Sequence, residues 1–238
     1  MKNFIKKKLK SLLAFIEDNF RFRNAAKSPI DFYLDEVSRN CYDFFKEHIS
    51  RSSVFLKDDD IRHHSILKAF NNNTSKDNIF LEFGVFKGDS IKLFSKFLSQ
   101  HGLEIYGFDS FEGLEEDWIV SDYNPAGTFS FNSKNLKIPR NVKIIKGKVQ
   151  NTLNDFLEKN KYKKITFIHM DMDTYTPTKY VLEKIKPFLQ KGSVILFDEL
   201  YGFPNWKKHE YKALNEVFNE NEYKYFAFGT RQVSVEIL

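Results

Sequence analysis

This sequence of 238 residues has a single cysteine, only six prolines and no long uninterrupted apolar run. One cysteine, Cys41, excludes an internal disulfide and a zinc site built on paired thiolates, which favours a reducing, cytoplasmic setting. No segment approaches the roughly 20 apolar residues that a membrane-spanning helix needs, so stable membrane insertion is not expected. Because 42% of the residues are hydrophobic, the chain can still bury one sizeable core.

Excess charge of either sign is also scarce. The net charge is +5, and the basic residues that produce it are concentrated in the first 27 residues. The remainder is roughly neutral, so a nucleic-acid partner is not indicated. The opening segment begins like a secretory signal, but its apolar run over residues 12–16 is short and ends in Glu17 and Asp18. We interpret it as a basic amphipathic helix that packs on a partner, is solvated, or lies on an anionic membrane surface.

The remaining chain divides at a polar cluster, Asn71–Asn78. Residues 1–70 show helical apolar spacing and no strand-like alternation. Beyond the cluster, short apolar runs alternate with amphipathic segments, a pattern that predicts parallel strands joined by right-handed helical crossovers. We therefore expect an N-terminal helical extension over residues 1–70 and an α/β domain over residues 71–238.

The end of the chain breaks this alternation. YKYFAF and RQVSVEIL are separated only by Gly229 and Thr230, which suits an antiparallel hairpin and cannot make a parallel crossover. The helix before the fifth strand is expected to start at Pro177 with Thr176 as its cap and to stop at Gly192. A mostly parallel seven-stranded sheet with an antiparallel last strand resembles the Rossmann-like fold of class I S-adenosylmethionine-dependent methyltransferases.

The first strand of the predicted sheet runs into a glycine-containing turn, EFGVFKGDS. In open parallel sheets the ligand lies beyond the carboxyl ends of the strands. Gly84 and Gly88 allow close backbone approach, the following helix N-terminus favours a carboxylate, and Glu82 is suited to an ammonium group. The spacing differs from the dinucleotide pattern G-x-G-x-x-G, which disfavours a nicotinamide enzyme. The other cofactor contacts that we assign are Val85, Phe86 and Ser90 in this turn and Asp171 after the fourth strand.

Two later segments are suited to a nucleoside. The second strand ends in IYGFDS, which places Asp109 where an acidic residue binds ribose hydroxyls, with Ser110 and Phe111 flanking the nucleoside. Gln150 in KGKVQNTL is placed to reach an adenine edge. A turn-capping role for Asp109 and a helix-entry role for Gln150 are the alternatives.

Carboxylates follow two strongly apolar runs, FIHMDMDTYTP and VILFDEL. His169, Asp171 and Asp173 come after the fourth strand, and Asp198 and Glu199 end the fifth. A carboxylate at the end of a buried strand is costly unless a cation, a proton or hydrogen-bond donors compensate it. Because neighbouring parallel strands end at one rim, these oxygen ligands predict a site for magnesium, manganese or calcium.

A cation there would lower the pKa of a substrate hydroxyl, so that a carboxylate can deprotonate it and the oxygen can attack a sulfonium methyl in line. Three alternatives stay open. Asp173 could cap the next helix, Asp171 and Asp198 could form a structural pair, and His169 could be a satisfied buried histidine.

Five segments together resemble the macrocin-type sugar O-methyltransferases, metal-dependent enzymes that use S-adenosylmethionine: LEFGVFKG, YGFDSFEGL, KG-x-x-Q-x-TL, HMDMDTY and GSVILFDELYGFPNW. The match spans residues 79–238. The resemblance implies Asp171, Asp198 and Glu199 as metal ligands, with Mg²⁺ favoured over Mn²⁺ or Fe²⁺, and Asp171 and His169 as catalytic residues. Many relatives carry two aspartates where this chain has Asp198 and Glu199.

The resemblance also implies a small sugar substrate with adjacent hydroxyls, carried on a nucleotide, a surface glycan or a glycosylated metabolite. The irregular residues 110–140 are expected to form a lid or a plain surface loop. Sugar contacts are expected from Trp118, Tyr201, Trp206 and His209. The first 70 residues are expected to reach the substrate or to form a homodimer interface.

Two other functions compete with this one. A nucleotide-sugar glycosyltransferase would use Asp171 and Asp173 as a D-x-D metal motif, but it has no need of the glycine turn or of Asp109. A binding module that has lost its activity would keep the fold, but it has no need of a clustered acidic rim.

Overall fold

The computed structural model describes residues 27–238 except residues 76 and 121, and the chain forms two compact units, residues 1–36 and 37–238. Helix α2 (Pro29–Ile49) starts in the smaller unit and continues into the larger one, and its first turn has a reciprocal cap. The backbone N–H and hydroxyl of Ser28 donate to Asp31 at 2.7 and 2.8 Å, and the Asp31 N–H donates to the Ser28 hydroxyl at 3.2 Å. The amphipathic helix expected at the start of the chain lies outside the described residues.

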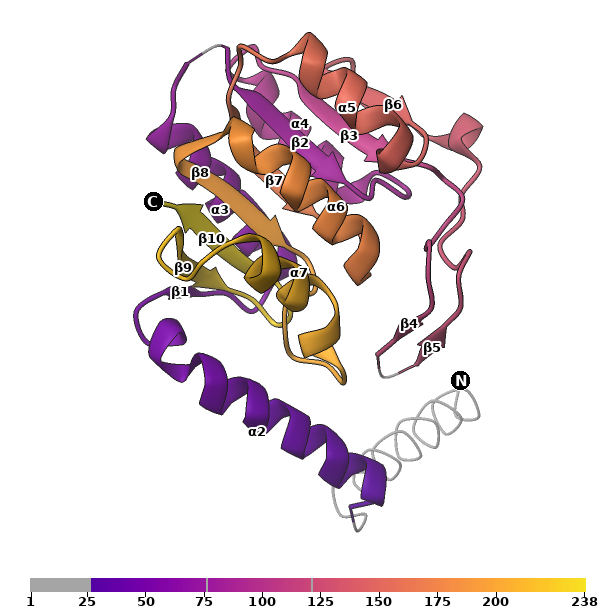
Figure 1. Cartoon of the computed structure of the whole chain (residues 1–238), viewed down its shortest axis with the longest axis vertical. Coiled ribbons are helices and arrows are strands. Elements are labelled where there is room, and N and C mark those ends of the chain that lie inside the picture. Colours follow the sequence, from indigo (N-terminus) through magenta and orange to yellow (C-terminus); the bar gives the residue numbers. More distant parts are fainter. Residues whose placement is uncertain (1–26, 76, 121) are drawn as a thin grey trace, which may run out of the picture. The chain divides into compact units, whose positions relative to one another are not determined.

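The larger unit is built on an eight-stranded sheet of order β1-β9-β10-β8-β7-β2-β3-β6 (Figure 1). Strand β10 is antiparallel to both of its neighbours, and all other pairs are parallel. The expected class I fold is confirmed, with one further edge strand, β1, whose two residues are too few to show alternation. The strands are β1 (Ser53–Val54), β2 (Ile79–Phe83), β3 (Ile105–Asp109), β6 (Val142–Lys146), β7 (Ile165–Met170), β8 (Leu189–Phe197), β9 (Tyr223–Phe228) and β10 (Val233–Ile237).

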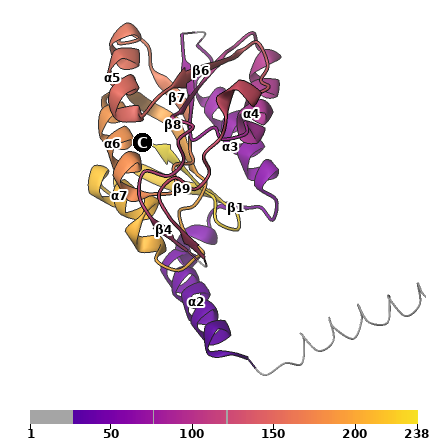
Figure 2. The ribbon, with the colours of Figure 1, turned by 90° about the vertical axis from the view of Figure 1, so that its right-hand side faces the viewer.

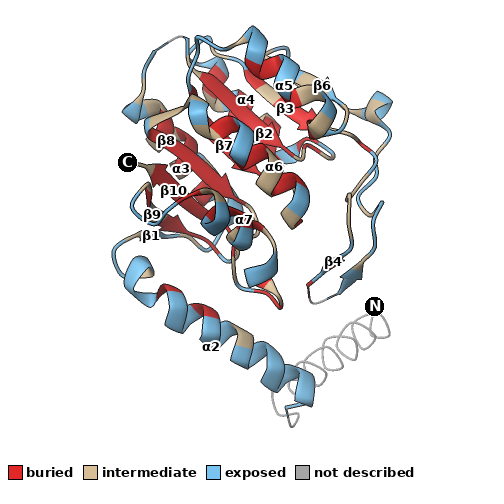
Figure 3. Cartoon of the chain, in the orientation of Figure 1, coloured by how far each residue is buried: buried red, intermediate tan, exposed pale blue. Residues whose placement is uncertain are grey.

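Helices cover both faces of the sheet (Figure 2). One face carries α3 (Asp58–Asn72) and α4 (Asp89–Ser99), and the other carries α5 (Val149–Lys159), α6 (Tyr175–Ile185) and α7 (Glu210–Val217). The central strands are largely buried (Figure 3). Because successive side chains of a strand point to opposite faces, each central strand contributes to two buried cores. Phe80 and Phe167 belong to the core of α3 and α4, whereas Leu81 and Ile168 belong to the core of α5 to α7.

Helix α6 begins two residues earlier than the sequence predicts. Its N-cap is Thr174 and its first residue is Tyr175. The backbone N–H and the hydroxyl of Thr176 both donate to Glu116 at 2.9 Å, so a distant carboxylate satisfies this helix end. A residue 60 positions away in the sequence gives no local signal of this cap.

The end of this helix and the last hairpin also differ in detail from the expectation. A 3-10 turn at Lys186–Phe188, which contains Pro187, follows α6 directly. Gly192 therefore lies within β8, at a φ of 84°, and is not the helix stop. The last two strands are antiparallel as predicted, but residues 229–232 connect them, with the Gly229 N–H donating to the Gln232 carbonyl at 2.7 Å.

Helix α3 comes from the region expected to be an extension, and it packs directly on the sheet. Ile61, Ile66 and Ala69 are fully buried in the same core as Phe80 and Val194. The division of the chain at residues 70 and 71 stays a prediction. Within residues 27–75, 77–120 and 122–238, no helix is long and apolar enough to cross a membrane.

Candidate active site

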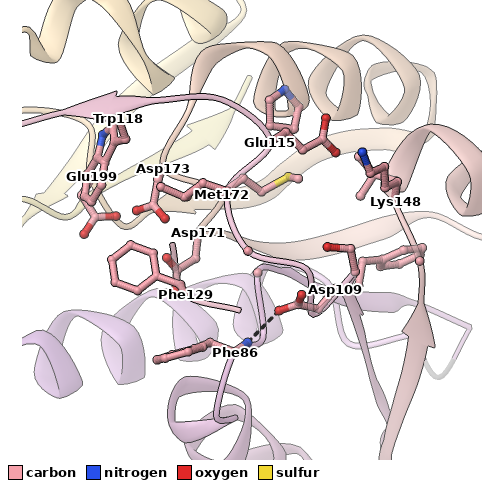
Figure 4. A pocket seen from close by; sticks show the side chains of 18 of the residues that line it. Phe86, Asp109, Glu115, Trp118, Phe129, Lys148, Asp171, Met172, Asp173 and Glu199 are labelled. Atoms are coloured by element: carbon pink, nitrogen blue, oxygen red, sulfur yellow. Dashed lines mark hydrogen bonds between the residues drawn. The ribbon is translucent and has the colours of Figure 1, made fainter. Parts of the chain in front are cut away.

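A cavity of about 410 Å³ opens where the central strands end (Figure 4). Strand β2 lies between β3 and β7. The next strand along the chain, β3, is added on one side of β2, and the later strand β7 is added on its other side, so the strand order reverses at β2. Ligands of open α/β sheets bind at such a switch point. The cavity walls come from the segments that follow β2, β3, β6, β7 and β8, together with the irregular residues after β3.

Gly84, the first residue after β2, is required by its surroundings. Its φ is 88°, and a Cβ placed on it would lie 1.7 Å from the Asp171 carbonyl oxygen. The Asp171 N–H donates to the Phe83 carbonyl at 2.9 Å, which holds the two segments together. Only glycine fits this left-handed position and this close approach, so the turn predicted to bind the cofactor lies directly against the predicted base.

Asp109, at the end of β3, forms hydrogen bonds that hold the same turn in place. Its Oδ2 accepts the backbone N–H groups of Val85 at 2.8 Å and Phe86 at 2.7 Å (Figure 4), and its Oδ1 accepts the N–H of Phe111 at 2.6 Å. A carboxylate offers about four acceptor sites, so room for a further donor remains. Asp109 lines the cavity, and its contact with a ribose stays a prediction.

The other predicted cofactor residues differ in how they lie relative to the cavity. Phe86 and Ser110 line the cavity, whereas Glu82 is fully buried beneath the turn and accepts from the Ser90 hydroxyl at 3.0 Å. Gln150 donates to Glu115, which does line the cavity, at 2.9 Å. The predicted residues that are buried behind the cavity surface are Val85, Gly88, Ser90 and Phe111.

Three carboxylates lie together at one end of the cavity, away from Asp109 (Figure 4). Asp171, Asp173 and Glu199 all line it, and one oxygen of each lies within 4.8 Å of the others. Asp198, which we predicted as a metal ligand, does not line this cavity. It forms a second group with Asp171 and His169. Both groups could hold a cation, so the metal role of Asp198 stays a prediction, and Asp173 is a further candidate that lines the cavity.

Within the described residues, no side chain forms an ion pair with Asp171, Asp173 or Glu199. Burial and the charge of Asp198 raise the pKa of Asp171 well above its ordinary value and that of Asp173 to about 7, and they also raise the pKa of Glu199. The Glu199 Oε2 is buried and has no hydrogen-bond partner within the described part of the chain. Buried carboxylates without donors need a cation or a proton. The oxygen donor set fits a hard divalent cation.

His169 lies in a buried chain of charges beneath the cluster. Its Nδ1 is 3.3 Å from Glu82, and its Nε2 is 3.1 Å from Asp198. Burial alone would lower the pKa of His169, but the two carboxylates raise it to about 10. With both ring nitrogens engaged and no exposed surface, His169 is placed to hold Asp198, not to touch a substrate.

Asp198 has further donors. Its Oδ1 also accepts from Arg62 Nη2 at 2.9 Å and from the Gln232 side chain. Burial would raise the pKa of Asp198, but the hydrogen bonds and charges of His169 and Arg62 hold it well below its usual range. Asp198 is thus an anion that the protein itself compensates.

The predicted sugar contacts are also divided by the structure. Trp118 lines the cavity, at the same end as Glu199 (Figure 4). Tyr201 donates its hydroxyl to the Gly229 carbonyl at 2.6 Å, and Trp206 is buried among aromatic side chains of α2 and α7. Neither of these two, nor His209, lines the cavity. The geometry supports a substrate contact for Trp118 and a packing role for Trp206.

The irregular segment after β3 is an ordered excursion with its own two short strands, β4 (Trp118–Ile119) and β5 (Tyr123–Asn124). The Leu114 N–H donates to Thr128 at 2.9 Å, and the Gly127 N–H donates to Leu114 at 2.9 Å. Through Glu116 the segment is bonded to the start of α6. It forms one wall of the cavity, and its role as a lid stays a prediction.

Sequence reasoning missed several residues of this region. Arg62 comes from α3 and Gln232 from the β9–β10 turn, and neither segment carries a recognisable motif. Glu210 is fully buried, and its Oε2 accepts the Glu199 N–H at 3.1 Å. Burial and the charge of Asp173 raise its pKa well above the ordinary value. In the sequence, only the position of Glu210 shortly after GSVILFDELYGFPNW pointed to this region.

The parallel sheet with one antiparallel strand, the glycine turn at the switch point and the cavity beyond the strand ends define the class I methyltransferase fold. The family model described as a methyltransferase domain matches residues 81–200, and the chain belongs to that family. It is an S-adenosylmethionine-dependent methyltransferase. The nucleotide-sugar glycosyltransferase alternative is therefore wrong.

Solved structures share this fold. The calicheamicin methyltransferase CalS11 superimposes with a TM-score of 0.62 at 22% identity, over 89% of this chain and 94% of that one. An apo structure of CalS11, described as a TDP-rhamnose 3'-O-methyltransferase, gives 0.57 at 21% identity over 89% and 96%. The O-methyltransferase NovP gives 0.55 at 17% identity over 75% and 78%. No curated protein sequence matches the chain.

Proposed function

We propose that this enzyme is a metal-dependent O-methyltransferase that transfers the methyl group of S-adenosylmethionine to a sugar hydroxyl. The observation that carries the proposal is the cluster of Asp171, Asp173 and Glu199 at one end of the cofactor cavity, with a buried Glu199 oxygen that has no partner among the described residues. A hydroxyl acceptor must lose a proton, and buried carboxylates are suited to receive it.

The proposed cofactor position follows from the glycine turn and from Asp109. The methionine end lies against the turn at Gly84, and Asp109 accepts from the ribose hydroxyls. Apolar side chains of Phe108, Val149 and Pro177 line the same cavity and suit the adenine ring. This places the sulfonium methyl group toward the carboxylate cluster.

The transfer is a single displacement. A lone pair of the sugar oxygen forms the new O–CH₃ bond while the S–CH₃ bond breaks, and S-adenosylhomocysteine leaves. The hydroxyl proton passes to a carboxylate oxygen of Asp171, the base predicted from the sequence, or of Asp173. In the metal-free protein burial raises the pKa of Asp173 to about 7, and a bound cation would lower it, so that the carboxylate is ionised and can accept the proton. Alignment of the two reactants supplies most of the rate.

A divalent cation is the second part of the proposal. The residues that would hold it are Asp171, Asp173 and Glu199, because they line the cavity and no side chain of the described residues forms an ion pair with any of them. When bound, the ion supplies positive charge that lowers the pKa of the sugar hydroxyl. Asp198 is excluded from this set in our proposal because its Oδ1 already accepts from Arg62, His169 and Gln232.

A sugar acceptor is supported by two observations. CalS11, which shares the fold, is described as acting on TDP-rhamnose. Trp118 and Phe129 line the cavity next to the carboxylates, and flat aromatic faces pack well on sugar rings. The acceptor is a nucleotide-linked sugar, a sugar of a capsule or lipopolysaccharide, or a glycosylated metabolite.

The test is a methyl-transfer screen with methyl-labelled S-adenosylmethionine and a panel of neutral, acidic and nucleotide-linked sugars, with product mass as the readout. We expect a methylated sugar whose formation stops when EDTA removes the metal and resumes when Mg²⁺ is added back. Asp171→Asn and Asp173→Asn should each lower the transfer rate by about 100-fold. Asp155→Asn, in an exposed position on α5, serves as the control.

Transfer that is indifferent to EDTA would remove the metal from the proposal. Methylation of amines, with sugars untouched, would overturn the acceptor class.

A further inference from the structure

A second cavity, of about 440 Å³, lies next to the first and shares Glu199 and Arg231 with it. It forms where the segment before α3 meets the turn between β9 and β10. Lys57 and Thr230 line it from these two segments. Arg231 therefore stands in the wall between the two cavities, and nothing derived above uses it.

The turn that carries Arg231 is fixed in place by backbone contacts. The Gly229 N–H donates to Gln232 at 2.7 Å and closes the turn, and the Leu200 N–H donates to the Arg231 carbonyl at 3.1 Å. A Cβ on Gly202 would lie 2.8 Å from the Thr230 carbonyl oxygen, so the segment after β8 approaches this turn closely. Because the backbone that carries Arg231 is already fixed, less conformational entropy is lost when Arg231 binds a ligand.

The guanidinium group of Arg231 has no anionic partner in the part of the chain that the structure describes. It lies over the ring of Phe203, with Cζ 5.9 Å from the ring centroid. Lys57 is likewise without an ion pair within the described residues and is exposed. Two unpaired cations thus face one cavity.

The acidic side chains of this cavity do not cancel these two cations. Asp198 is compensated by Arg62 and His169. Glu199 belongs to the cluster that we assign to a divalent cation. Asp58 is exposed in the first turn of α3, where the helix dipole favours a negative charge. The charge left to act on a ligand is that of Arg231 and Lys57.

We propose that Arg231, with Lys57, binds an anionic group of the methyl acceptor, a phosphate or a carboxylate, while the reacting hydroxyl lies at the carboxylate cluster. The inference rests on the proposed sugar O-methyltransferase function and deepens it. The acceptor class is then a sugar with a negative substituent. A nucleoside diphosphate and a uronic acid are the two sources of that charge.

Arginine is suited to this role because its fork of donors matches the oxygens of phosphate and carboxylate. Placed in the wall between the cavities, it holds the acceptor at a fixed distance from the methyl group. A neutral sugar would meet the same carboxylates but would lack this anchor.

The test is calorimetric titration of the whole protein, saturated with S-adenosylhomocysteine and Mg²⁺, with four probes: UDP-glucose, glucose 1-phosphate, glucuronic acid and glucose. We expect one or more charged probes to bind at least about ten-fold more tightly than glucose. Arg231→Gln should remove that preference, Arg231→Lys should keep part of it, and Arg140→Gln, an exposed arginine before β6, should leave it unchanged. Tight binding of UDP-glucose alone identifies the nucleotide as the anchor, and tight binding of glucuronic acid identifies a carboxylate.

Equal binding of charged and neutral probes, binding of none of them, or a preference that survives in Arg231→Gln would overturn the inference. S-adenosylhomocysteine affinity is measured in parallel for every variant. If wild type binds the cofactor but ignores charge, this inference fails and the methyltransferase stands. If wild type does not bind the cofactor, the proposed function itself fails.

Discussion

Arg62 Nη2 lies 2.9 Å from Asp198 Oδ1, and this ion pair joins helix α3 to the end of strand β8. The two side chains are only 17% and 14% exposed, so solvent screens the pair little. The alternation of side chains along β8 explains why Asp198 faces α3. Leu196 faces the core of α3 and α4, and Asp198, two residues later, faces the same side. The charge of Asp198 is thus compensated by protein side chains, whereas Asp171, Asp173 and Glu199 form no ion pair within the described residues.

The first prediction concerns this pair. Removing one partner of a buried pair costs about 3–5 kcal/mol when nothing else compensates the other charge. Because His169 and Gln232 remain, we expect Arg62→Gln to lower the free energy of unfolding by about 2 kcal/mol, measured by urea denaturation. Arg51→Gln, which removes an exposed pair with Glu47, should change it by less than about 0.5 kcal/mol. Equal losses in the two variants would show that Arg62 compensates nothing.

The second prediction separates steric contact from backbone conformation at Gly84. Gly84→Ala and Gly102→Ala both place a side chain at a positive φ, which costs about 1–2 kcal/mol. A Cβ at Gly102 meets nothing within 4 Å, whereas one at Gly84 would overlap the Asp171 carbonyl. We therefore expect Gly84→Ala to lose about 4 kcal/mol or more, or to fail to fold, and Gly102→Ala to stay folded. Similar melting temperatures for the two variants would contradict the close approach of the turn to Asp171.

The third prediction is a pH dependence of metal binding. Burial, with the charge of Asp198, raises the pKa of Asp173 from its ordinary value to about 7, so in the metal-free protein this group contributes most to stability at low pH. That contribution is lost as the pH rises through about 7. A divalent cation must displace the proton, so Mg²⁺ should raise the melting temperature more at about pH 8 than at about pH 6. Asp173→Asn should weaken this difference, and a stabilisation by Mg²⁺ that does not vary with pH would contradict the assignment.

Much of the site could be predicted because it depends on strand order alone. Gly84, Asp109 and Asp171 follow parallel strands, and the ends of parallel strands must meet at one edge of the sheet. The antiparallel final strand was predictable for a similar reason, since a connection of a few residues cannot cross a sheet.

The rest depends on contacts between distant segments. Arg62 lies 136 positions from Asp198, and no local pattern on α3 marks it as part of the site. The family resemblance assigned Asp198 to the metal, and the structure shows the protein donors that Asp198 also has. Trp206 is buried and does not line the cavity. The sequence could not show this, because an aromatic residue near a predicted site has the same sequence signal whether it lines a cavity or packs in a core.

The most direct test of the central claim is a calorimetric titration of the purified protein with S-adenosylmethionine. Wild type should bind one equivalent, and Asp109→Ala, which releases the Gly84 turn and removes the proposed ribose acceptor, should bind at least about ten-fold more weakly. Asp122→Ala, in an exposed position of the lid segment, should bind like wild type. Failure of the wild type to bind, or equal affinities for Asp109→Ala and Asp122→Ala, would contradict the placement of the cofactor in this cavity.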